Sequence, residues 1–121
     1  MNRGNILKIA TYNCGIELLL NMIGGKWKTL IMYYLINKRK RFSELKSLLP
    51  GITSKMLTKQ LRELERDGLI KREIYHQVPL KVEYSLTAKG MELEEILLQM
   101  CEVGTRYLDH EDSCQKAVQL V

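Results

Sequence analysis

The chain has 121 residues, of which 45% are hydrophobic, and it carries a net charge of +5. This length predicts one domain with a modest core, and the apolar content excludes a disordered protein. The apolar runs are too short to span a bilayer, and neither a signal peptide nor a secreted disulfide scaffold is indicated. We therefore expect a cytoplasmic protein.

The charge is divided unevenly along the chain. Residues 1–72 hold 15 Lys/Arg and 5 Asp/Glu, a net charge of +10, whereas residues 73–121 hold 4 and 9, a net charge of −5. A basic half of this kind favours contact with nucleic acid or another anionic surface. The alternative is that the asymmetry only reflects the surface composition.

Two helices are predicted in residues 14–37, after an N-terminal arm of residues 1–13. The first, residues 16–23, is apolar and ends at a Gly-Gly pair. The second spans residues 26–37 and has apolar residues at the spacing of a core-facing helix. These residues are Trp27, Leu30, Ile31, Tyr34 and Leu35.

A helix-turn-helix is predicted in residues 43–67, after a basic turn, Lys38, Arg39, Lys40 and Arg41, and a very short candidate strand at residues 41–42. Ser43 is a plausible N-cap for a short helix over residues 44–49. Thr53 caps the next helix, and Ile52 and Leu57 have the spacing of a hydrophobic staple. Gly68 stands where a left-handed glycine ends a helix.

The helix that begins at Thr53 has one leucine side and one basic side. At 100° per residue, Leu57, Leu61 and Leu64 fall together, and four cations fall opposite them: Lys55, Lys59, Arg62 and Arg66. Its N-terminal half, the part that usually contacts base edges, contains no acid. Ser54, Lys55, Thr58 and Lys59 are therefore the candidate readers, and Arg62 is a candidate contact to the phosphate backbone. For Arg66, near the C-terminal end, solvation alone is an open alternative, as a solvated surface helix is for the whole stretch.

Residues 69–87 predict two antiparallel strands, because apolar residues alternate in IKREIY and VEYSL around a loop that contains Pro79. His76, Gln77 and Lys81 are expected near the tip of this wing, within reach of a phosphate or the minor groove. Arg41, in the basic turn, is a further candidate for contact with the DNA backbone. Solvated side chains are the alternative for each of these residues.

A long helix is predicted over residues 88–110, from about Ala88 to Leu108, with Thr87 as its cap and residues 111–121 as a tail. Its apolar stripe has no obvious partner within the chain beyond the first helix, which indicates a twofold dimer. The stripe could instead close its own domain. The candidate interface residues are Leu93, Ile96, Leu97, Met100, Val103 and Tyr107.

The order of elements predicts one α+β domain, mostly α: a winged helix-turn-helix with a two-stranded antiparallel wing and terminal dimerisation helices. The sequence shows no phosphate loop and no nucleophile elbow, so we expect no enzyme. A metal site of Cys101, His110 and Cys114 would lack a fourth ligand nearby, and we expect neither a metal nor a cofactor.

Four runs of the sequence carry a family resemblance: GGKWKTLIMYYL (24–35), RFSELK (41–46), LPGITSKMLTKQLRELERDGLIKR (49–72) and VPLKVEYSLTAKG (78–90). In order and spacing they resemble the HxlR family of MarR-like winged helix-turn-helix bacterial transcription regulators, over residues 14 to about 107. The resemblance implies a homodimer on a palindromic double-stranded DNA operator, with residues 53–67 as the recognition helix. A protein–protein module that binds an acidic partner is the alternative function.

Cys14 stands where many members of that family have a cysteine, although Gly15 follows it here where proline is usual. The resemblance implies that Cys14 is a candidate sensor of oxidants or electrophiles. A helix N-terminus just after it would favour the thiolate. The alternative is a small buried side chain near the dimer interface. The sequence does not identify an inducer.

Overall fold

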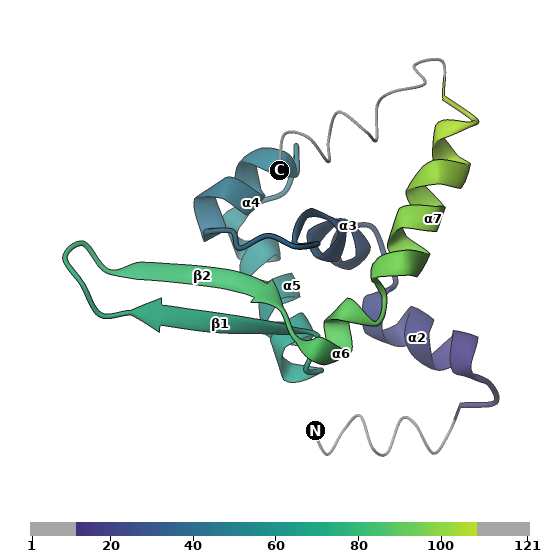
Figure 1. Ribbon diagram of the computed structural model, residues 1–121, viewed down its shortest axis with the longest axis horizontal. Helices are drawn as coiled ribbons and strands as arrows, with labels where there is room; N and C mark the ends of the chain where they lie inside the picture. Colours follow the sequence, from purple (N-terminus) through teal and green to yellow (C-terminus); the bar gives the residue numbers. More distant parts are fainter. Residues whose placement is uncertain (1–11, 109–121) are drawn as a thin grey trace.

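The computed structural model describes residues 12–108, and Figure 1 shows how their elements are arranged. The hairpin of two strands projects to one side, and α2 and α7 lie at the opposite end, away from its tip. The elements, in chain order, are α2 (Gly15–Ile23), α3 (Trp27–Tyr34), α4 (Phe42–Leu48), α5 (Ser54–Arg66), β1 (Ile70–Tyr75), β2 (Lys81–Leu86), α6 (Ala88–Met91) and α7 (Glu94–Thr105).

Helix α3 is the centre of the core, because it contacts α4, α5 and α7. The predicted face of α3 is confirmed at four of its five residues, since Ile31 and Leu35 are buried and Trp27 and Tyr34 pack against the core. Leu30 is partly exposed, whereas Met32 is fully buried, and the core-facing row of α3 is Lys28, Ile31, Met32 and Leu35. The helix also ends earlier than predicted, at Tyr34, and the chain turns through Asn37 at a φ of 55°, a conformation that asparagine tolerates.

The segment before α4 differs from the prediction by a few residues. The isolated strand pairing falls at Lys40, which exchanges backbone hydrogen bonds with Tyr84, and not at residues 41–42. Helix α4 begins at Phe42, because the carboxylate of Glu44 accepts a hydrogen bond from the Arg41 backbone N–H and sets the start of the helix there.

The wing is an antiparallel pair, as predicted, in which Ile70 lies opposite Leu86 and Tyr75 lies opposite Lys81. Side chains alternate between its two faces. The inner face contributes Ile70 and Leu86 to the core. The outer face is polar and carries Lys71, Glu73, Tyr75, Lys81, Glu83 and Ser85.

The predicted long C-terminal helix is broken in two. Thr87 does cap its start, since its hydroxyl oxygen accepts a hydrogen bond from the Gly90 N–H. Helix α6 ends after one turn, and the N–H of Leu93 bonds to the Gly90 carbonyl, three residues back. The break lets α6 stay against the base of the wing while Leu93 and Leu97 pack into the core beside α3.

Candidate nucleic-acid interface

Helix α5 has the two sides that its sequence predicts. Leu57, Leu61 and Leu64 are buried in the core, whereas the cations opposite them are exposed. The Thr53 side chain accepts a hydrogen bond from the Met56 N–H at 3.0 Å and caps the helix. At the other end, Gly68 has a φ of 76°, which permits the left-handed turn into the wing. Both ends of the helix are thus fixed by local chemistry.

The N-terminal half of α5 presents donors that are free to bind an anion. Lys55 and Lys59 are exposed, and within residues 12–108 neither forms an ion pair. Ser54 is exposed beside them. The Thr58 hydroxyl donates to the Ser54 carbonyl at 2.8 Å, so its oxygen lone pairs remain available as acceptors. This surface can contact phosphates and base edges.

The first acid in the sequence of α5 is compensated. Glu63 is bound by Lys28 of α3, whose Nζ lies 2.6 Å from Glu63 Oε1. The hydrogen bond from Lys28 lowers the pKa of Glu63, and the charges of Lys28, Lys59 and Arg66 act in the same direction, while burial opposes them. Glu63 therefore stays ionised at neutral pH. Its negative charge interacts with Lys28 of α3 and also with the cations Lys59 and Arg66 of α5.

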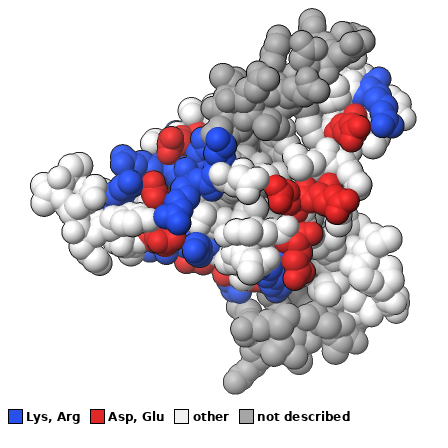
Figure 2. Space-filling model, in the orientation of Figure 1, with Lys and Arg blue, Asp and Glu red and all other residues white. Residues whose placement is uncertain are grey.

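The residues of the basic turn lie in different environments. Arg41 is exposed at the start of α4, next to the helix-turn-helix. Lys40 is buried. Arg39 donates from Nη1 to the Tyr75 hydroxyl of the wing at 3.0 Å, and Lys38 is exposed. Figure 2 shows Lys and Arg gathered over the base of the wing and the neighbouring helix, with some Asp and Glu among them and a larger acidic group toward the α6–α7 side.

The tip of the wing is uncharged. His76 and Gln77 are exposed there, as predicted, and they precede Val78, which is fully exposed, and a cis peptide bond to Pro79. Lys81 begins β2 behind the tip, with its Nζ 3.4 Å from Glu83 Oε2 and stacked over the Tyr75 ring. On the face that Figure 2 shows, the end of the wing carries no Lys, Arg, Asp or Glu. A contact between this tip and DNA would therefore depend on His76 and Gln77.

Cys14 lies at the N-cap position of α2 and is a free, exposed thiol. It is therefore accessible to reagents, and it is not part of the core of the described subunit. Of the three residues that the sequence analysis considered and rejected as metal ligands, His110 and Cys114 lie outside the described residues. Within residues 12–108, no group of three or more His, Cys, Asp or Glu is placed to hold a metal ion.

The residues predicted for the dimer interface fall into two sets. Leu93 and Leu97 are buried in the subunit's own core, and the remaining four residues are exposed. At 100° per residue the exposed set falls within an arc of about 60° on α7. Leu20 and Ile16 on the neighbouring α2 are also exposed. The exposed residues in this set are Ile96, Met100 and Val103 of α7, and Tyr107 in the turn that follows it.

Sequence reasoning missed the partner of Glu63. Lys28 was available as a signal, because it precedes Ile31, Met32 and Leu35 by three, four and seven residues and therefore lies on their face of α3. A lysine on a buried face requires a counter-charge.

No helix in the described part of the chain has the length and apolar content needed to cross a membrane.

Comparison with known proteins agrees with this geometry. The family model described as HxlR-like helix-turn-helix matches residues 22–112. The chain is 54% identical over 104 residues to the helix-turn-helix-type transcriptional regulator YdeP of Bacillus subtilis, a match that covers 86% of this chain and 81% of YdeP.

Solved structures of two regulators are also similar. The redox regulator HypR in its oxidised form has 55% identity and a TM-score of 0.76, with 79% of this chain and 99% of that chain covered. The transcriptional regulator YodB of Bacillus subtilis, in its reduced form, has 31% identity and a TM-score of 0.68, with 81% and 96% covered. YodB has also been solved after diamide treatment.

Proposed function

Because the chain belongs to the HxlR-like helix-turn-helix family of transcription regulators, we propose that it acts as a homodimer that binds a palindromic operator. The observation that carries this proposal is the exposed, acid-free N-terminal half of α5, held between the core and the wing. A helix with these two sides fits a major groove about 12 Å wide. The chain would act as one winged-helix domain, residues 1–121, in the cytoplasm.

We assign roles within this surface by position. Ser54, Lys55, Thr58 and Lys59 would contact base edges and nearby phosphates, since the N-terminal half of a recognition helix reaches the bases. The remaining candidates would contact the backbone or the minor groove. These are Arg41 at the start of α4, Arg62 on α5, and His76, Gln77 and Lys81 on the wing. Contacts by Lys and Arg to phosphates make the affinity strongly dependent on salt.

The dimer is supported by the apolar arc of α7. Tyr107 is 84% exposed and Met100 is 55% exposed, and Leu20 of α2 is 63% exposed. A monomer in water would leave these large side chains solvated at one end of the molecule, and a twofold contact would bury them on both subunits. The exposed surfaces of α2 and α7 lie at the end opposite the wing tip (Figure 1), so this contact would leave the wing accessible.

Footprinting on the DNA that flanks the gene tests the function. We expect two protected half-sites whose centres are about 34–36 Å apart along the duplex, or a multiple of this spacing. Retention on heparin and on DNA-cellulose at rising salt provides a further comparison. A protein–protein module that binds an acidic partner would be retained on heparin, but it would give no footprint at any salt concentration.

A second proposal concerns control by Cys14. The exposed free thiol and the similarity to HypR and YodB, which were solved in redox-distinct or diamide-treated forms, support a role in sensing oxidants or electrophiles. We expect diamide to change operator binding by the wild-type protein and to leave binding by Cys14→Ser unchanged. If both proteins respond equally to diamide, Cys14 is not the sensor.

A further inference from the structure

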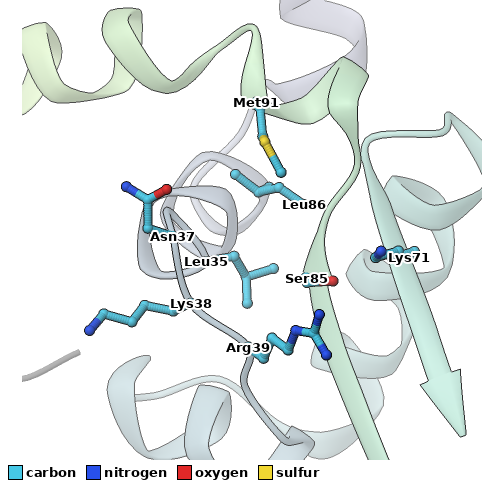
Figure 3. A pocket seen from close by; sticks show the side chains of 8 residues that line it. All are labelled: Leu35, Asn37, Lys38, Arg39, Lys71, Ser85, Leu86 and Met91. Carbon is cyan, nitrogen blue, oxygen red and sulfur yellow. The ribbon is translucent and has the colours of Figure 1, made fainter.

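A small pocket at the base of the wing combines an apolar floor with cations. It has a volume of about 190 Å³ and is formed by the end of α3, the following turn, both strands and α6. None of its lining residues comes from α5. Figure 3 shows Leu35, Leu86 and Met91 along the pocket, with the Arg39 guanidinium beside Ser85 and with Asn37 and Lys38 on the opposite side.

The apolar floor of the pocket is fixed in position, because Leu35 and Leu86 belong to the core. Leu35 and Leu86 are 1% and 4% exposed, and they are continuous with the main cluster. Met91 is 56% exposed and lies at the edge, where a flexible thioether side chain can adapt to different shapes. Because Leu35 and Leu86 expose so little surface, a short hydrocarbon body in this pocket would contact mainly Met91.

The charge of the pocket is positive. Lys38, Arg39 and Lys71 line it, and no acidic residue of the described chain does. Two carboxylates contact the lining residues from outside the pocket: Glu73 lies 3.4 Å from the Lys71 ammonium, and Glu94 accepts a hydrogen bond from the Asn37 amide at 3.0 Å. The Lys71–Glu73 pair is exposed and therefore easily exchanged for another anion.

Arg39 gives the pocket its directional donor. Its Nη1 donates to the Tyr75 hydroxyl, which in turn donates to the Glu73 carboxylate at 3.2 Å, and no ion pair within residues 12–108 involves its guanidinium. A guanidinium binds carboxylate or phosphate oxygens through two parallel hydrogen bonds, and these charge-assisted bonds are stronger than a bond to a neutral hydroxyl. The hydroxyl of Ser85 lies on the same side of the pocket and can donate to the same group.

We propose that this pocket binds a small organic anion with a short apolar body, with its anionic group on Arg39 and Lys71 and its hydrocarbon on Leu35, Leu86 and Met91. The volume is below the 300–1,000 Å³ of sites for drug-sized ligands, so the ligand is metabolite-sized. DNA binding does not explain this pocket, because a phosphate backbone carries no hydrocarbon group that would contact the apolar floor. The proposal does not depend on operator binding.

The test uses three probes that separate charge from hydrocarbon: hexanoate, acetate and hexan-1-ol. Each is titrated into the full chain without DNA, and binding is followed by NMR of the Met91, Leu86 and Leu35 methyl groups. We expect saturable shifts with hexanoate and at least about tenfold weaker binding of acetate and hexan-1-ol, because each lacks one half of the recognition. Equal binding of hexanoate and hexan-1-ol, or no saturable binding of hexanoate at millimolar concentration, would overturn the proposal.

Two variants locate the ligand. Arg39→Gln should weaken hexanoate binding at least about tenfold through the lost charge-assisted bonds. Met91→Glu places a carboxylate at the exposed edge and should weaken it similarly, without disturbing the buried floor. The matched control is Lys46→Gln, which removes an exposed cation of α4 outside the pocket. Unchanged affinity in both pocket variants, or the same loss in Lys46→Gln, would also overturn the proposal.

Discussion

The Nζ atom of Lys28 on α3 lies 2.6 Å from Oε1 of Glu63 on α5, and it joins the helix at the centre of the core to the candidate recognition helix. The Lys28 side chain is 10% exposed and that of Glu63 is 25% exposed. Lys28 thus holds a charge in the core-facing row of α3. The pair sets how α5 lies on α3 and keeps the Glu63 charge paired next to the basic surface.

Removal of the Glu63 charge is expected to destabilise the fold, because Lys28 would remain buried without a counter-charge. We expect Glu63→Gln to lower the free energy of unfolding by about 1–3 kcal/mol, less than for a fully buried pair because Glu63 is partly exposed. The matched control is Glu65→Gln, an exposed carboxylate of the same helix, with a change within about 0.5 kcal/mol. Urea unfolding measures both, and equal values for the two variants would contradict the assigned role of the pair.

The same pair gives a pH dependence with a definite sign. Mainly through the hydrogen bond from Lys28, the folded state lowers the pKa of Glu63 from its ordinary value of 4.5. The stabilisation is therefore complete above about pH 4.5 and is lost as the pH falls through the lowered folded-state pKa. The difference in unfolding free energy between wild type and Glu63→Gln should shrink on acidification from neutral pH toward about pH 3. A difference that grows toward low pH would show that the sign is wrong.

Lys59 is the most direct test of the orientation of α5. It is exposed opposite the buried leucines, so Lys59→Ala should leave thermal unfolding unchanged. If Lys59 contacts a phosphate, the variant should weaken operator binding by roughly 1 kcal/mol or more and reduce the slope of log affinity against log salt by about 1. Arg106→Ala, an exposed cation of α7, serves as the control. Unchanged binding by both Lys59→Ala and Arg62→Ala would show that another face of α5 meets the DNA.

The α7 arc predicts the effect of an added charge on oligomeric state. Met100→Glu places a carboxylate within the exposed arc, midway along α7, and should shift a dimer toward monomer, because a buried unpaired charge is costly. Leu98→Glu adds the same charge to an exposed leucine of the same helix, about 160° away from Met100, and should leave the dimer intact. Sedimentation velocity at micromolar concentration reports both. A wild-type monomer under these conditions would refute the dimer.

Much of the fold could be predicted from local chemistry. The Thr53 and Thr87 caps, the left-handed glycine at Gly68 and the alternation of the two strands each depend on a few neighbouring residues, and each was correctly expected. The two sides of α5 followed from the spacing of its leucines alone. Each of these features is decided by contacts between residues that lie only a few positions apart in the sequence.

The errors arose where distant parts of the chain decide the outcome. The break between α6 and α7 arises because α6 packs against β2 at the base of the wing, whereas α7 packs against α3. Residues 88–108 contain no proline that would indicate this break. The buried side of α3 is wider than predicted because three helices pack around it, so that Lys28 and Met32 are buried as well. The pocket at the base of the wing was missed because Arg39, Lys71 and Met91 are far apart in sequence and meet only in the folded chain.

Gly90 of the VEYSLT-G run has a packing role that the sequence alone did not explain. The Thr87 N–H bonds to the Leu69 carbonyl, and Gly90 lies directly above the same carbonyl, so that a Cβ at position 90 would fall 2.1 Å from the Leu69 oxygen. Backbone atoms cannot give way as a flexible side chain can. Gly90→Ala should therefore separate α6 from the base of the wing and cost at least about 2 kcal/mol of unfolding free energy.

For a domain of this size, that loss corresponds to a melting temperature lower by roughly 10 °C. Gly15→Ala is the matched control, since a Cβ added at the start of α2 would have no neighbouring atom within 4 Å, and alanine there should be neutral or slightly stabilising. Thermal unfolding followed by circular dichroism compares the two variants with wild type. If Gly90→Ala melts like Gly15→Ala, the close approach of α6 to Leu69 does not exist in solution, because an added methyl group cannot share the space of a carbonyl oxygen.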